Sequence, residues 1–251
     1  MNTTRYSGRY APDRASEWPG ETAGERLGAV GALLAGGLFL LLVVYVYGVL
    51  ARLGLSAEMF DDRLRLFPWV AAHRGAYTAL WWLTLLSTVA LLPAPLAVHD
   101  RLRHAAPGVS RFAAVAGVGG VVLGLLSPLV MAAVSPVLAQ AYVSAEPATQ
   151  AAVLATAEAF AQVGLHLRMG ANLLLAIWLG TAGALMLRSG LFGARLGGAC
   201  LVVAVFTLLT VATKPFALAD LEPFVAPLLG LVYLWLGVAL WPARPAQPSA
   251  A

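Results

Sequence analysis

The sequence predicts an all-α fold: a polytopic membrane protein built as a bundle of six transmembrane helices with a partly structured extracytoplasmic cap. Hydrophobic residues make up 60% of the 251 residues, charged residues only 11%, and the mean hydropathy is +0.81. A soluble domain usually has about a quarter of its residues charged, and a chain of this length cannot hide so much apolar surface from water. Lipid can surround it, because a bilayer replaces water as the outer solvent.

Six apolar runs are each close to the length of about 20 residues that crosses a hydrocarbon core. The predicted spans are residues 27–50, 77–98, 112–131 with an extension, 166–187, 196–213 and 224–241. No short apolar core with a small-residue cleavage site follows the polar first 26 residues, and the first apolar run is long enough to span, so we expect it to be retained. Residues 1–26 are predicted to be a disordered cytoplasmic tail, 27–241 the transmembrane domain, and 242–251 a cytoplasmic tail.

Basic residues set the predicted orientation. With the N-terminus inside, the inner segments hold Arg5, Arg9, Arg14, Arg26, Arg101, Arg103, Arg111, Arg188, Arg195 and Arg244, and the outer segments hold Arg52, Arg63, Arg65, Arg74 and Lys214. This bias predicts that both termini are cytoplasmic. The abundance of Ala, Leu, Gly and Arg suggests a GC-rich bacterial genome, and therefore a bacterial inner membrane. The basic residues are scattered and form no patch with interleaved aromatics, so no nucleic-acid partner is predicted.

Two predicted outer segments are more than short links. In the first, 51–75, the alternating stretch "RLRLF" fits either a short strand or one side of an interfacial helix, and Pro68–Trp69 suggests a turn resting on the headgroups. We interpret this segment as an interfacial loop, with a lid over an outward cavity as the alternative. In the second, Pro147 suits the first turn of a helix. A helix from 147 to 187 would measure about 62 Å, so it either starts outside the lipid or bends near Gly164.

The third span carries two Ser-Pro pairs, which predict a kink or a break because Pro lacks the backbone donor of a helix. They are Ser127–Pro128 and Ser135–Pro136. Small residues at fourfold spacing in the first and third spans predict close helix packing in lipid. These are Gly28, Ala32 and Gly36, and then Ala116, Gly120 and Gly124.

The candidate site lies in "EAFAQVGLHLRMGANLLLAIW", where a polar helix enters the membrane. The candidate ligand-binding residues are Glu158, Gln162, His166, Arg168 and Asn172. At 100° per residue they share one half of the helix. Unpaired polar groups facing lipid cost several kcal/mol, so this half should face the bundle or an outer aqueous vestibule. In the structural interpretation Arg168 and His166 snorkel to the interface and Glu158 pairs with Gln162; in the functional one they bind a ligand.

No catalytic motif is present: GxSxG, HExxH, CxxC, a Walker A loop and GxGxxG after a strand are all missing from the sequence. No ionisable residue falls at the midplane of a predicted span, which argues against proton-coupled transport. The single Cys200 supports neither a disulfide nor a thiolate cluster, and His73 with His166 lacks ligand spacing. We therefore predict no catalytic residue, no metal and no cofactor.

The stretch "LMLRSGLFGARLGGACLVVAVFTLL" resembles the DUF4386 family of bacterial multi-spanning membrane proteins. The matching pattern is an apolar span, a tight polar turn and the opening of the next span, here Arg188, Ser189, Gly190, Leu191, Phe192, Arg195, Leu196 and Gly197. Similar proteins usually place Pro after the Phe, where this chain has Gly193. Read physically, Arg188 ends one helix and Gly190 allows its cap. The family has no assigned activity, so the resemblance implies the architecture only.

We expect a non-enzymatic membrane protein whose outward-facing vestibule binds a small molecule or lipid, or which acts as a membrane partner subunit. The alternative is a membrane-embedded enzyme or permease acting at the same vestibule. The expected partners are the lipid bilayer, a small-molecule or lipid ligand, and another membrane protein.

Overall fold

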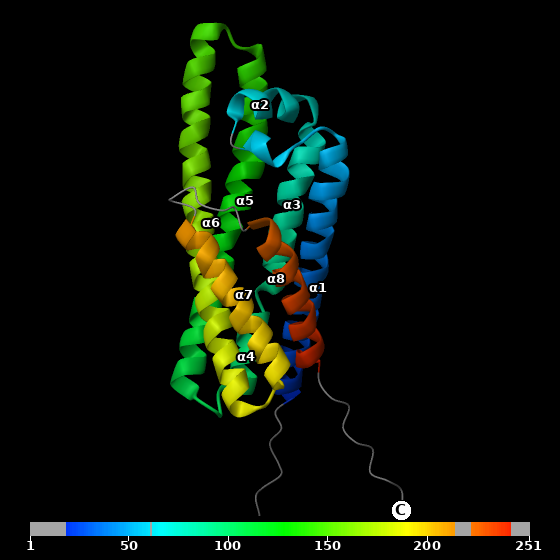
Figure 1. Ribbon diagram of the computed structural model, residues 1–251, viewed down its shortest axis with the longest axis vertical. Coiled ribbons are helices and arrows are strands. Elements are labelled where there is room, and N and C mark those ends of the chain that lie inside the picture. The colour runs from blue at the N-terminus through cyan, green and yellow to red at the C-terminus, as the bar shows by residue number, and fades with distance from the viewer. Residues whose placement is uncertain (1–18, 61, 214–221, 242–251) are drawn as a thin grey trace, which may run out of the picture.

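The computed structural model describes residues 19–60, 62–213 and 222–241, and within these ranges it contains helices and no strand (Figure 1). The elements are α1 (Pro19–Val44), a π-helical continuation (Tyr45–Leu50), a short 3-10 helix (Ala57–Phe60), α2 (Arg63–Ala72), α3 (Arg74–Leu91), α4 (Ala94–Leu102), α5 (Pro107–Ser144), α6 (Pro147–Ser189), α7 (Ala194–Thr213) and α8 (Glu222–Leu240). Asp61, Lys214, Asp220, the Glu222 side chain and most of both predicted tails lie outside the described residues.

The described helices confirm an all-α polytopic membrane protein. Five helical stretches are long and apolar enough to cross a membrane, namely Ala23–Leu50, Arg74–Leu102, Pro107–Ser144, Pro147–Ser189 and Ala194–Thr213, and Val225–Leu240 is a shorter apolar helix. The start of α1, the end of α8 and the α6–α7 turn gather at one end of the bundle, whereas α2 and the α5–α6 turn lie at the other (Figure 1). We call these the inner end and the outer end, after the orientation that the basic residues predict.

Glycines bring the helix backbones together, as the sequence predicts. A Cβ atom on Gly36 of α1 would lie 2.6 Å from the carbonyl oxygen of Gly230 in α8, and one on Gly120 of α5 would lie 3.1 Å from that of Ala171 in α6. No Cβ atom fits at 2.6 Å from a backbone oxygen. Glycine therefore permits a separation between α1 and α8 that gains dispersion contact along the whole interface, which is what holds helices together in lipid.

The structure divides one predicted span, and in another it excludes a break while the kink stays a prediction. The expected second span is divided at Leu92–Pro93 into α3 and α4, because Pro93 has no amide hydrogen to continue the α3 ladder. In α5 the opposite holds: one helix runs from Pro107 to Ser144 through Pro128 and Pro136, so it is not broken at either proline. Both prolines are buried.

The helix α6 is continuous over its 43 residues and passes through Gly164. At 1.5 Å per residue it measures about 64 Å, whereas a hydrocarbon core is about 30 Å thick. Of the two alternatives for this segment, the structure supports a helix that starts outside the lipid.

The outer cap is helical, not extended. Leu66, Phe67, Trp69 and Val70 form the buried face of α2, and this spacing is helical. The expected turn at Pro68–Trp69 is wrong, because Pro68 lies inside α2.

Polar contacts fix the cap at three points. The Asp62 carboxylate accepts a hydrogen bond from the Leu64 amide at 3.0 Å and so caps the start of α2. The Trp69 indole donates to the Leu53 carbonyl at 2.7 Å. The Tyr45 hydroxyl, in the π-helical turn, donates to the Ala76 carbonyl at 2.9 Å. The last two bonds join α2 and α3 to the outer end of α1.

Arg101, at the end of α4, joins four elements at the inner end. Its Nε lies 3.0 Å from Glu25 Oε1 on α1. Its Nη atoms donate to the last carbonyls of α8, Ala239 at 2.8 Å and Leu240 at 3.0 Å. Its guanidinium also lies 5.7 Å from the centre of the Phe192 ring in the α6–α7 turn. A planar guanidinium has enough donors for all these acceptors.

Candidate functional site

The predicted site residues lie near the outer boundary of the membrane. Counting 1.5 Å per residue from Ser189 at the inner surface of a bilayer about 40–45 Å thick, Gln162 falls about 40 Å along α6, in the outer headgroup layer, and Glu158 about 46 Å along it, at the outer border. His166 and Arg168, at about 34 and 32 Å, fall near the outer edge of the hydrocarbon core. Asn172 lies one turn deeper than Arg168.

These residues continue the side of α6 that packs on α7. Below them, a Cβ atom on Gly180 of α6 would lie 3.5 Å from that of Ala204 in α7. The two helices are antiparallel, so nine residues from Gly180 and Ala204 toward the outer end, Ala171 of α6 lies level with Thr213, the last residue of α7. At 100° per residue, the five polar residues lie on the same side of α6 as Gly180 but nearer the outer end. The outermost of them therefore lie beyond Thr213, where α7 ends, and do not pack against α7.

Local contacts connect three of the five. Gln162 Nε2 donates to Glu158 Oε1 at 2.7 Å, the pair that the sequence predicts, and His166 Nδ1 lies 2.7 Å from the Gln162 carbonyl oxygen. Their side chains are exposed, whereas Arg168 and Asn172 are half-buried. Arg168 is also engaged in an interaction of its own. The structure thus arranges Glu158, Gln162 and His166 in one exposed row.

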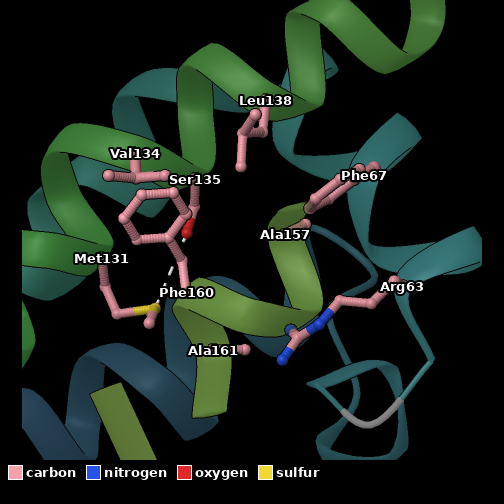
Figure 2. Close-up of a pocket in the computed structure, with 9 residues that line it drawn as sticks. All are labelled: Arg63, Phe67, Met131, Val134, Ser135, Leu138, Ala157, Phe160 and Ala161. Atoms are coloured by element: carbon pink, nitrogen blue, oxygen red, sulfur yellow. Dashed lines mark hydrogen bonds between the residues drawn. The ribbon is translucent and has the colours of Figure 1, made fainter. Parts of the chain in front are cut away.

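A contact from another helix reaches this row. Arg63 Nε of α2 lies 3.7 Å from Glu158 Oε2, with the two side chains 26% and 52% exposed. Beside this ion pair is a small hollow between α2, α5 and α6 (Figure 2). Its lining residues are Arg63, Phe67, Met131, Val134, Ser135, Leu138, Ala157, Phe160 and Ala161. The volume is about 10 Å³, the space of one water molecule.

Polar side chains gather around Ser135, which lines this hollow. The Ser135 hydroxyl points to the Met131 sulfur at 3.7 Å (Figure 2), and a thioether is a weak acceptor. The Tyr77 side chain interacts with Ser135 and Trp81 and lies within electrostatic range of Arg63. The Trp81 indole nitrogen is buried, and it interacts with the Tyr77 hydroxyl. We call Arg63, Tyr77, Trp81 and Ser135 the donor cluster.

None of the five predicted site residues lines the hollow, and sequence reasoning did not find the donor cluster. Its members come from three helices that the sequence could not place side by side. Two of the members, Tyr77 and Trp81, lie on the same helix, α3. Their spacing of four residues, which puts both on one face of a helix, was the available signal. Among the described residues, no three His, Cys, Asp or Glu side chains come together as metal ligands would.

The comparison with known families agrees with this architecture. The model described as Domain of unknown function (DUF4386) matches residues 34–241, which is most of the chain. The chain belongs to the DUF4386 family. Neither the curated proteins nor the solved structures gave a match.

The turn that carries the DUF4386 resemblance lies between α6 and α7. Gly190 caps α6 with the left-handed φ of 69°, as the sequence predicts. Gly193 has φ of 77°, a value that the proline usual at this place in the family cannot adopt. This DUF4386 chain therefore closes the turn with a second left-handed glycine.

Proposed function

We propose that this DUF4386 protein is a non-enzymatic binding protein of a bacterial inner membrane, with cytoplasmic termini and a site for a small molecule or lipid at its outer end. The observation that carries the proposal is the donor cluster beside the hollow under α2. Buried donors in proteins are nearly always paired, and leaving one unpaired costs about 1–3 kcal/mol. A bound group with acceptor atoms would satisfy the Ser135 hydroxyl, which lines the hollow, better than the weak Met131 sulfur acceptor does.

The rest of the lining is what a ligand site needs. Ligand sites are mostly apolar with a few polar groups that fix orientation. Here Phe67, Leu138 and Phe160 supply the apolar surface. Ala157 and Ala161 are small, and Met131 is flexible, so the hollow can enlarge when side chains rotate.

Opening does not require α2 to leave the bundle. Each fully buried Leu, Phe or Val contributes roughly 1.5–3 kcal/mol, and Leu66, Phe67 and Val70 are all at most 2% exposed. The Arg63–Glu158 pair is partly exposed, and such pairs are worth about 0–1 kcal/mol. The buried face of α2 therefore contributes more stability than the Arg63–Glu158 ion pair does. Rotation of the Arg63 side chain is the easier way to open the hollow.

Native mass spectrometry of the protein in a mild detergent tests the proposal. We expect a non-protein mass bound to the wild type, strongly reduced in Arg63→Ala and retained in Arg65→Ala. Arg65 is a matched control because it lies on the same helix, is 72% exposed, and pairs with Asp62 instead of Glu158. A wild-type spectrum of bare protein alone, or equal occupancy in the two variants, would show that the donor cluster is not a binding site.

A further inference from the structure

We infer that the ligand is an anionic amphiphile of the outer leaflet, whose oxyanion takes the place of the Glu158 carboxylate beside Arg63 while its acyl chain passes Phe160 and Met131 into the bilayer. This inference rests on the proposed function and names the class of ligand for the same hollow. Three features of the site carry it: its charge, its depth and its lining.

The charge of the site selects an anion. The donor cluster contains one cation, Arg63, and three neutral groups that can donate. The carboxylate that pairs with Arg63 belongs to Glu158, on the exposed side of the hollow, and the contact is long at 3.7 Å. A ligand oxyanion held bidentately by the guanidinium makes stronger, charge-assisted bonds.

Release of Glu158 costs little. The Glu158 side chain is 52% exposed and keeps its hydrogen bond from Gln162 at 2.7 Å when Arg63 leaves. The displaced carboxylate therefore stays solvated and hydrogen-bonded, and exchange of one anion for another leaves no buried charge unpaired. A cationic head would instead meet Arg63 as a like charge.

The depth of the hollow selects a lipid. Met131 and Leu138 lie 24 and 31 residues along α5 from Pro107, or about 36 and 46 Å at 1.5 Å per residue. The bilayer with its headgroups is about 40–45 Å thick, so the hollow lies at the outer headgroup layer, where lipid phosphates and carboxylates are found. Arg63 is on the side away from the hydrocarbon and Met131 on the side toward it.

The lining shows where the chain would leave. Phe160 is 41% exposed although it lines the hollow, and Met131 and Val134 are half-buried. These apolar side chains form one wall of the hollow, on the side away from Arg63 (Figure 2). A soluble oxyanion would gain nothing from such a wall, whereas an acyl chain gains contact along it.

Photocrosslinking in vesicles tests the inference. A diazirine-bearing palmitate is compared with its methyl ester and with the corresponding alkyl ammonium, each in phosphatidylcholine vesicles that hold the protein, and the labelled peptides are mapped. We expect the carboxylate to label the α5 and α6 segments around the hollow. Labelling there should fall about tenfold or more in Arg63→Ala, because a hydrogen bond to a charged group is lost, with partial recovery in Arg63→Lys and no change in Arg65→Ala.

A second pair of variants tests whether the ligand needs the volume of the hollow, without changing any charge. Ala161→Leu fills the hollow and should abolish labelling, whereas Ala159→Leu, on an exposed face of the same helix, should leave it unchanged. Equal labelling by the ester or the ammonium at the hollow would overturn the anionic class and keep the proposed binding function. If no probe labels the hollow and native spectra show no bound mass, both fail together.

Discussion

Neighbouring glycines in α1 offer a direct test of how this bundle is held together. Gly36→Ala places a methyl group 2.6 Å from the Gly230 carbonyl oxygen, 2.7 Å from the Leu234 amide nitrogen and 2.8 Å from Leu234 Cγ. Two of these atoms are backbone, so α8 must move away along its length. At Gly37, one residue on, an added Cβ meets no atom within 4 Å.

The two substitutions should change stability in opposite directions. Both gain the helix propensity of alanine, up to about 1 kcal/mol. Only Gly36→Ala pays for overpacking, typically about 1–3 kcal/mol. We therefore expect Gly37→Ala to be neutral or slightly more stable than the wild type, and Gly36→Ala to be less stable by roughly 1–2 kcal/mol.

Reversible unfolding in mixed micelles of rising dodecyl sulfate content, followed by circular dichroism, measures both free energies. Helix content before unfolding serves as the control for local effects on α1. If Gly36→Ala is as stable as Gly37→Ala, the α1–α8 contact is not the close backbone contact described here, and the role given to its glycines is wrong.

Three further substitutions have defined outcomes. Arg101→Ala leaves Glu25 and two α8 carbonyls without their donor, so it should lower the free energy of unfolding by about 2–4 kcal/mol. The control Arg111→Ala, at an exposed position, should stay within about 0.5 kcal/mol of the wild type. Equal losses in the two variants would show that Arg101 does not join these elements. Trp69→Phe deletes one indole hydrogen bond and should cost about 0.5–1.5 kcal/mol, with faster amide exchange in the cap than in α7. Gly190→Ala places a side chain at φ of 69° and should cost about 1 kcal/mol, measurable as a lower thermal midpoint; an unchanged midpoint would contradict the left-handed cap.

The spans could be predicted because length and hydropathy are local properties. A run of about 20 apolar residues has few other stable solutions, so the long helices followed directly. The cap could not be predicted in the same way. In α2, Arg63 and Arg65 alternate with Leu64 and Leu66, which fits a strand as well as one side of an interfacial helix, and Pro68 suggests a turn. Burial of one helical face against α5 outweighs both local signals.

The candidate site could likewise be predicted only in part. Helical periodicity placed Glu158 and Gln162 on one half of α6 and predicted their pairing. It could not show that Arg63, nearly a hundred residues earlier, reaches the same carboxylate, because that requires the position of α2 on the bundle. Arg101 was missed for the same reason: its partners on α1 and α8 are adjacent only in space.

The unequal heights of the helices have a practical consequence. The α5–α6 turn lies about 36 Å beyond the level where α7 ends, by the 24 residues that separate Pro147 from Ala171 at 1.5 Å each. Among the described helices this tip projects furthest at the outer end (Figure 1), so we expect it to stand clear of a detergent belt. A nanobody raised against it would give electron microscopy a rigid fiducial, and an epitope tag inserted at Ala145–Pro147 would report on intact cells which side of the membrane the tip occupies.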